Sequence, residues 1–236
     1  MAPFKHTTII ADLRELIRLL KFHKFDSDKI MEFHNLERLV GDSRNGSNHN
    51  YNIEDIVFYS SNSGMKSNPF VKAISIFLKS NYRLVEVLSI KDDMFLEYTL
   101  EIFIKGYKDK TKVDDFSFFS WHLDRELNTD GDYIHPYYHF HAGGRHVGDK
   151  NPGDLLMISS PRIPHPPMDI LLSIHFIILN FLNSGDFKNK TAILHDDDYI
   201  SIIQRAQQRL LDPYFFTFNK VLHNDYSRHN LFPLYI

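Results

Sequence analysis

The sequence predicts an α+β fold in a single domain, residues 1–236, with a mostly antiparallel sheet of four to five strands at about residues 82–160, flanked by N-terminal and C-terminal helices. Apolar residues recur every three to four positions near both ends of the chain, which is the period of an amphipathic helix. The middle is rich in Val, Ile, Phe and Tyr, and its segments follow one another through short loops, as in antiparallel sheets. No internal repeat and no Pro/Gly/Ser-rich linker divides the chain.

Three helices are expected before the sheet. The first, Thr7–Phe22, has one apolar and one charged face. The second, Ser27–Val40, begins with a serine that suits an N-cap, and Gly41 can adopt the left-handed conformation that ends a helix. The polar stretch Asp42–Asn52 is expected to be an exposed loop. A short third helix is expected over Pro69–Asn81, because proline suits a first helical turn.

Segments with strand composition fill the middle of the chain. The expected strands are Tyr82–Ile90, Phe95–Lys105, Phe116–Glu126, Pro136–Ala142 and Leu155–Ile158. The last of them is apolar on both faces, as expected for a central strand that a helix covers.

Two helices are expected after the sheet. Met168–Leu182 begins after a pair of prolines, and Gly185 can end it. The acidic run Asp196–Asp198 places negative charge at the start of Tyr199–Leu211, where it stabilises the positive end of the helix dipole. Pro213 is expected to stop this last helix.

Composition excludes several classes of chemistry. The chain has no cysteine, so disulfides, thiolate nucleophiles and Cys-ligated metal centres are excluded. A formal net charge of −3 gives no sequence-wide attraction for nucleic acid or anionic lipid. The longest apolar run, residues 170–182, is shorter than the roughly 20 residues of a bilayer span, and the N-terminus lacks an export-signal pattern. We therefore expect a cytoplasmic protein without membrane contact.

Histidines cluster in the middle of the chain. Seven of the 14 histidines fall within 54 positions: His122, His135, His139, His141, His146, His165 and His175. In a strand of period two, His122 and Asp124 share one face and the opposite face is apolar. The same alternation puts His139 and His141 together on the next strand. If the apolar faces of the two strands align, all four side chains project onto one surface, because a one-residue slip would bury the imidazoles.

This polar patch is the predicted catalytic site. Its expected catalytic residues are His122, Asp124, His139, His141 and Arg162, and its expected metal ligands are His122, His139 and His141. Imidazoles with a carboxylate suit zinc, manganese, iron or nickel, so a divalent metal is the candidate cofactor. Without a metal, an imidazole beside a carboxylate can act as a general base, because its ordinary pKa lies near neutrality. The alternative is a solvated sheet face with no catalytic role.

Four residues are expected to bind substrate: Gly143, Gly144, Arg145 and His165. Paired glycines allow positive φ and a close approach of the backbone, which suits an anion site and equally a tight turn. The arginine that follows them can neutralise a phosphate. Four prolines between residues 161 and 167 stiffen the segment that carries His165, which suits a preorganised site and equally a plain strand-to-helix connection.

Two phrases of the sequence carry a resemblance. His135–Gly144 reads His-Pro-Tyr-Tyr-His-Phe-His-Ala-Gly-Gly, and Ser160–Asp169 reads Ser-Pro-Arg-Ile-Pro-His-Pro-Pro-Met-Asp. Together they resemble an uncharacterised prokaryotic family, a domain of unknown function of about this length, most clearly over the central third of the chain. The resemblance implies a bacterial or archaeal protein and assigns no catalytic residue.

The leading interpretation of these residues is a nuclease-like hydrolase with a His-rich site on one face of the sheet, in which a histidine or a metal-bound water supplies the base or nucleophile. The alternative is a non-catalytic interaction subunit of a bacterial defence or toxin–antitoxin complex, which would use the aromatic and His-rich face for docking. Nucleic acid or a protein is accordingly the candidate partner.

Overall fold

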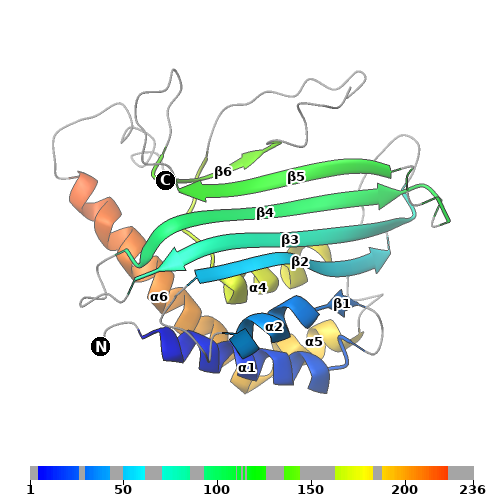
Figure 1. The fold of residues 1–236 in the computed structure, drawn as a ribbon, viewed down its shortest axis with the longest axis horizontal. Coiled ribbons are helices and arrows are strands. Elements are labelled where there is room, and N and C mark those ends of the chain that lie inside the picture. Colours follow the sequence, from blue (N-terminus) through cyan, green and yellow to red (C-terminus); the bar gives the residue numbers. More distant parts are fainter. Residues whose placement is uncertain are drawn as a thin grey trace.

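The structure is a computed structural model that describes residues 5–26, 30–42, 50–61, 71–85, 93–109, 111–112, 114, 116–125, 136–143, 163–182 and 188–222. It confirms the α+β class. One antiparallel sheet has its strands in chain order, from β1 to β7, and the helices lie against one of its faces (Figure 1). We call the face opposite these helices the outer face.

The sheet is larger than the expected four to five strands. Its seven strands in the described residues are β1 (Met31–Glu32), β2 (Asn50–Ser61), β3 (Ala73–Leu84), β4 (Phe95–Tyr107), β5 (Phe116–Arg125), β6 (Tyr138–Ala142) and β7 (Ile163–Pro164). The helices described are α1 (His6–Phe22), α2 (His34–Asp42), α4 (Ile170–Phe181), α5 (Lys188–Leu194) and α6 (Asp197–Leu222). The sheet therefore begins well before residue 82, because β1, β2 and most of β3 precede it.

The expected helix at Pro69–Asn81 is wrong where the structure describes it, because β3 occupies this segment. The spacing of Ile74, Phe77 and Leu78 fits a short helix, but the buried residues Ile74 and Leu78 also fit a strand of period two. The segment forms a strand because it pairs with β2 on one side and with β4 on the other. The expected strand Tyr82–Ile90 overlaps only the last residues of β3.

Strand β2 was not expected from the sequence. A β-bulge between Ile53 and Ile56 interrupts its alternation, and Asp55 within the bulge has a φ of 48°. The bulge lets both isoleucines be buried although they are three positions apart, so the segment lacks the strict period of two that marks a strand.

Helix boundaries also differ from expectation. Helix α2 begins at His34 instead of Ser27, because Met31–Glu32 pairs with β2. Helix α6 continues through Pro213 to Leu222 instead of stopping before the proline. Helices α1 and α4 lie where they were expected, and the expected strand Leu155–Ile158 falls outside the described residues.

The core between the sheet and the helices fixes which side chains reach the outer face. Leu123 of β5 and Phe140 of β6 are cross-strand partners and are both buried on the helix side. The ring of Phe140 packs against Trp121 and against Phe176 of α4, with centroid separations of 4.9 Å and 6.2 Å.

Within the described part of the chain, none of the helices combines the length and apolar character that a bilayer crossing requires.

Candidate metal and general-base site

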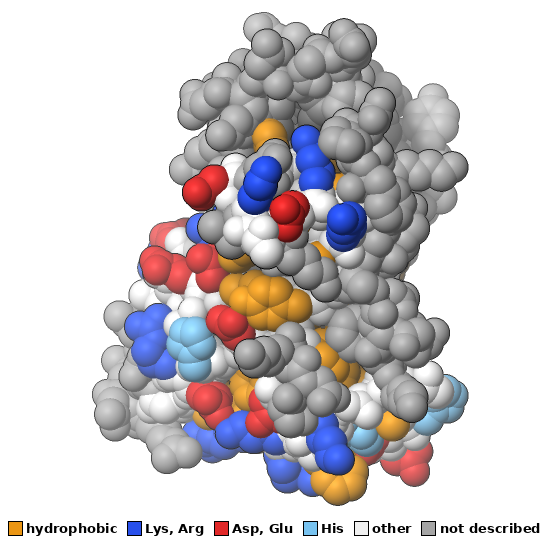
Figure 2. Space-filling model, turned by 90° about the vertical axis from the view of Figure 1, so that its right-hand side faces the viewer, with side chains coloured by type: hydrophobic (Ala, Val, Ile, Leu, Met, Phe, Trp, Pro, Cys, Tyr) orange, Lys and Arg blue, Asp and Glu red, His pale blue; other side chains and the backbone are white. Residues whose placement is uncertain are grey.

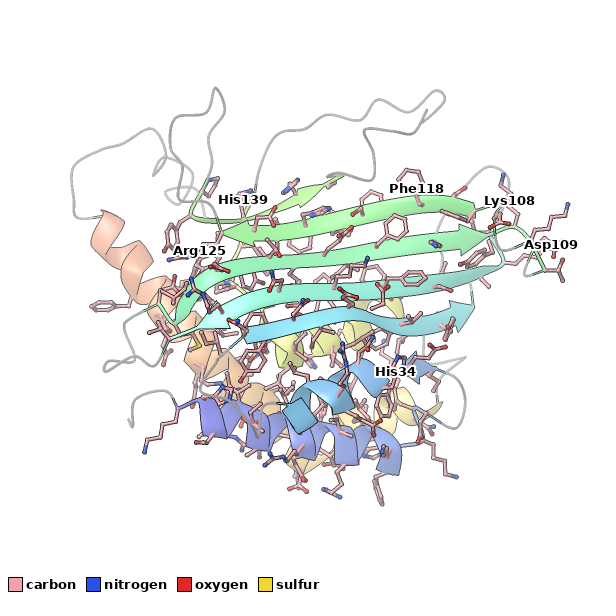
Figure 3. The ribbon with its side chains drawn as sticks, viewed as in Figure 1. His34, Lys108, Asp109, Phe118, Arg125 and His139 are labelled. Carbon is pink, nitrogen blue, oxygen red and sulfur yellow. The ribbon has the colours of Figure 1, made fainter. Side chains whose placement is uncertain are left out.

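The register of β5 and β6 brings the predicted polar residues together. His122 is paired with His141, and Asp124 is paired with His139. Because the neighbouring Leu123 and Phe140 point into the core, alternation directs the four polar side chains to the outer face. The predicted shared face of the four residues is therefore confirmed, while the catalytic roles stay predictions. Figure 3 shows His139 on this part of the sheet, near Arg125 at the end of β5.

Three of these residues form a group that can hold a metal ion. One ligand atom from each of Asp124, His139 and His141 lies within 4.8 Å of the other two. His141 Nε2 and Asp124 Oδ2 are 3.1 Å apart, and the ring centroids of His139 and His141 are 5.5 Å apart. The third member of the group is therefore Asp124, whereas His122 was expected from the sequence as the third ligand.

A backbone contact orients His139. Its side chain is buried, with 3% of its surface exposed, and its Nδ1 lies 2.9 Å from the carbonyl oxygen of Pro136. Since a carbonyl only accepts, Nδ1 carries the hydrogen and donates it, and Nε2 carries the lone pair. Histidine ligands of metals usually have this kind of second hydrogen bond, which fixes the ring and its tautomer.

His122 lies beside the group but has different partners. Its Nε2 is 3.2 Å from Ser120 Oγ and 3.7 Å from Glu101 Oε1 on the neighbouring strand β4. Its ring stacks on that of His141 at a centroid separation of 5.4 Å. The imidazole of His122 thus lies next to a carboxylate and stacks on one residue of the candidate ligand group. In this position it can accept or donate a proton.

A hollow opens over these side chains on the outer face. Its volume is about 320 Å³, and it is lined by Asn52, Ile53, Glu54, Lys79, Ser80, Asn81, Thr99, Leu100, Glu101, His122, Asp124 and His141. Glu54 comes from β2, Lys79 from β3, Glu101 from β4 and Asp124 from β5, so four neighbouring strands contribute charged side chains to one cavity. His122, Asp124 and His141 are therefore accessible to a small polar ligand, whereas His139 is buried and does not line the hollow.

The other predicted site residues do not all join this cluster. Gly143 has a positive φ of 105° and its N–H donates to the carbonyl of Ser120 at 2.8 Å, so it follows β6 in a conformation that favours glycine. Gly144, Arg145 and Arg162 fall outside the described residues.

The structure does not bring His165 to the cluster. Its ring packs on Phe140, at a centroid separation of 5.3 Å, and Phe140 faces the helices. Its Nδ1 donates to the carbonyl of Pro166 at 2.7 Å, and burial lowers the pKa of its imidazole. Alternation across β7 explains the placement, because Pro164 is paired with His139 and the next residue turns to the opposite face.

Two residues of the site were missed by sequence reasoning. Glu101 lies in an expected strand and alternates with buried Leu100 and Ile102, so pairing that strand with β5 would have brought it beside His122. No sequence pattern placed Lys79 at the site, because the segment that contains it also fits a helix.

Comparison of the chain with protein-family models, with curated proteins and with solved structures gives no match.

Proposed function

We propose that the protein is a metal-dependent hydrolase that cleaves phosphodiester bonds at the His-rich site. The observation that supports this function is the Asp124, His139 and His141 group with a further imidazole, His122, that has its own carboxylate partner, Glu101. A ligand set of two imidazoles and one carboxylate suits zinc or manganese and leaves coordination positions for water and substrate.

The three ligand atoms fit an ion after small side-chain rotations. Bonds of about 2.0–2.2 Å to a tetrahedral ion put ligand atoms roughly 3.4 Å apart. The present separations of up to 4.8 Å therefore need to shorten by at most about 1.4 Å. The 3.1 Å contact between His141 and Asp124 is already close to this separation.

The residues of the site have different roles in the proposed hydrolysis. Asp124, His139 and His141 would hold a divalent ion, which would supply polarisation of a phosphate oxygen and a lowered pKa of a coordinated water. His122 accepts the proton of the attacking water, and the nearby carboxylate of Glu101 compensates the positive charge that the imidazole gains. Ser120 fixes the direction of the ring through its hydroxyl.

The substrate is expected to be anionic. A bound ion would neutralise a phosphate seated in the hollow, and Lys79 adds one ammonium group to a lining that also contains Glu54 and Glu101. A metal centre with a separate general base serves hydrolysis, whereas redox chemistry at the same ligand set has no need of the His122 and Glu101 pair.

Metal content and cleavage test the proposal together. The protein is stripped with EDTA, reloaded with zinc or manganese, analysed by mass spectrometry for metal stoichiometry, and incubated with single-stranded RNA and DNA. We expect one ion per chain and metal-dependent cleavage. His139→Gln and Asp124→Asn should lose metal and activity together. His122→Gln should keep the metal and lose roughly 100-fold or more in rate, as expected for removal of a general base.

The matched control is His34→Gln, which alters an exposed histidine on α2, remote from β5 and β6 (Figure 3). This variant should keep both metal and activity. Folded protein that binds no metal and cleaves nothing would reject the hydrolase and favour a non-catalytic interaction subunit. Bound iron with oxygen consumption would instead indicate an oxygenase, which uses the same ligand set.

A further inference from the structure

A second hollow lies on the outer face, next to the one over the His-rich site. It has a volume of about 340 Å³, and we call it the aromatic groove after four of the side chains that line it, Phe77, Phe103, Phe116 and Phe118; Asp55, Lys79 and Lys105 complete the lining. Lys79 lines both hollows, so the groove continues the site along the strands. Figure 3 shows Phe118 on β5, toward the end of the sheet that carries Lys108 and Asp109. Figure 2, which views this end of the molecule, shows hydrophobic side chains exposed among Lys, Arg, Asp and Glu.

The rings of the groove form a row across three strands. Phe77 of β3 and Phe103 of β4 are cross-strand partners with centroids 6.3 Å apart, and Phe103 is 5.9 Å from Phe118 of β5. All three side chains are half-buried on the outer face, where they lie away from the helix-covered core. A row of phenylalanines that keeps part of its surface exposed is a platform for another flat apolar group.

Positive charge accompanies the rings. The Nζ of Lys105 lies 5.0 Å from the ring centroid of Phe77, 5.9 Å from that of Phe103 and 4.7 Å from that of Phe116. Lys79 sits at the boundary between the two hollows, with its Nζ 3.7 Å from Asp55 Oδ1. Aromatic faces with lysines between them match the bases and the phosphates of single-stranded nucleic acid.

We propose that the aromatic groove stacks a base of a single-stranded nucleic acid whose scissile phosphodiester lies at the His-rich site. This inference rests on the proposed function and specifies its substrate class. Every base has a flat face, so stacking on Phe118 holds the strand with little sequence preference, while Lys105 supplies positive charge for the backbone.

The spacing of the two hollows selects a strand over a single nucleotide. His122 and Phe118 are four residues apart on the same face of β5, which corresponds to roughly 13 Å at a rise of about 3.3 Å per residue. This distance is longer than one nucleotide. The stacked base therefore belongs to a nucleotide beyond the one whose phosphate reacts, and a mononucleotide does not span the distance from Phe118 to His122.

Binding of fluorescein-labelled oligouridylate and oligothymidylate, measured by fluorescence anisotropy in EDTA so that no cleavage occurs, tests the inference. Loss of one stacking ring in Phe118→Leu should weaken binding roughly 5- to 150-fold. Phe118→Trp should restore it, because indole also stacks. Lys105→Gln should weaken binding and flatten its dependence on salt. Uridine monophosphate should compete poorly with the oligonucleotide.

Phe119→Leu is the matched control, because Phe119 is the next residue on β5 and its ring lies 5.0 Å from that of Trp121 on the other face of the sheet. It should leave binding unchanged. Unaltered binding in Phe118→Leu, an equal loss in Phe119→Leu, or full competition by the mononucleotide would overturn the inference.

These outcomes separate the inference from the proposed function. If metal content and cleavage are normal and Phe118→Leu changes neither binding nor cleavage, the groove proposal fails alone. If Phe118-dependent binding is found in a protein that holds no metal and cleaves nothing, the hydrolase fails alone and the nucleic-acid platform stands.

Discussion

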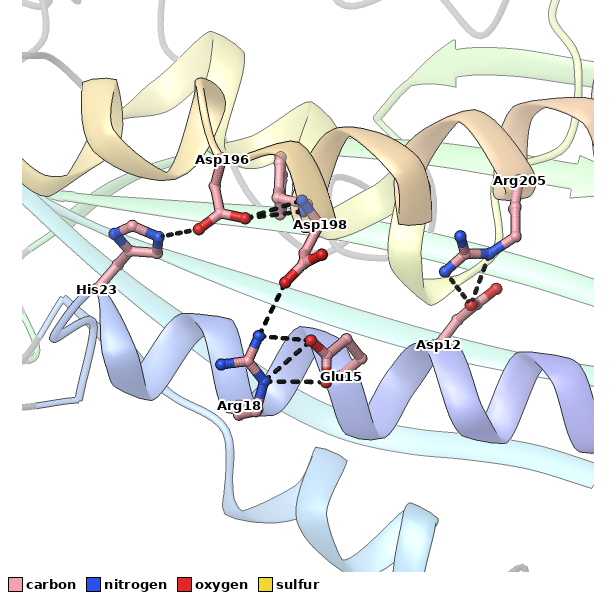
Figure 4. Close-up of polar contacts among 8 residues, drawn as sticks. Asp12, Glu15, Arg18, His23, Asp196, Asp198 and Arg205 are labelled. Carbon is pink, nitrogen blue, oxygen red and sulfur yellow. Dashed lines mark hydrogen bonds and ion pairs between the residues drawn. The ribbon is translucent and has the colours of Figure 1, made fainter.

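A charge cluster between α1 and α6 allows a quantitative test of how the helix layer is held together (Figure 4). Asp12 of α1 is 5% exposed, and both of its carboxylate oxygens accept hydrogen bonds from arginines of α6. Arg205 donates to Oδ1 from Nε at 3.0 Å and from Nη2 at 2.7 Å, and Arg209 donates to Oδ2 from Nη1 at 2.6 Å. Arg209 also lies 3.7 Å from Asp169, the N-cap of α4, so one guanidinium links three helices.

We expect Asp12→Asn to lower the free energy of unfolding by about 3 kcal/mol. The Arg209 side chain is only 12% exposed, and removing one partner of a buried ion pair costs about 3–5 kcal/mol. The amide of asparagine still accepts one hydrogen bond, which places the expected value at the lower end. The Arg205 side chain is 50% exposed and can return to water, so Arg205→Gln should cost at most about 1 kcal/mol.

Urea unfolding followed by circular dichroism and by the fluorescence of the single tryptophan, Trp121, measures both variants. In thermal unfolding, Asp12→Asn should lower Tm by roughly 6–12 °C for a chain of this size. Its metal content should stay at the wild-type level, because the cluster lies on the helix side of the sheet. A loss below about 0.5 kcal/mol for Asp12→Asn, or an equal loss for Arg205→Gln, would refute the reasoning.

Two further changes test local contacts. Asp196 caps α6, and the hydrogen bond from His23 at 2.9 Å is the main cause that holds its pKa below the usual range. Its charge therefore stabilises the fold above the unfolded pKa of about 3.9 and stops doing so as the pH falls through the lower folded value, so Asp196→Asn should cost about 1 kcal/mol at pH 7. A gap of the same size near pH 3 in urea unfolding would contradict this. Gly106→Ala should cost about 1–2 kcal/mol, because the new Cβ would lie 2.9 Å from Cγ2 of buried Val71. The loss should shrink in a Val71→Ala background, and an unchanged loss there would show that the contact is not its cause.

Much of the fold follows from local patterns in the sequence. The 3–4-residue spacing of α1 and the alternation of β4 and β5 each depend on a single segment, so they could be predicted without knowing the partner segments. Strands β2 and β3 could not. The bulge at Asp55 breaks the alternation of β2, and the apolar spacing of β3 fits helix and strand alike until neighbouring strands pair with it. Pro213 likewise lies inside α6, although the general preference of proline for helix ends predicts that the helix stops before it.

The candidate site likewise has features that the sequence predicts and features that depend on the tertiary structure. The sequence by itself determined that His122, Asp124, His139 and His141 share one sheet face, because burial of the intervening apolar residues excludes the one-residue slip that would turn the imidazoles into the core. Only the tertiary structure decided that Asp124 joins the metal group, that Glu101 partners His122, and that His165 turns to the helix side. These outcomes depend on side-chain distances between strands that are remote in sequence, and alternation within one strand carries no information about them.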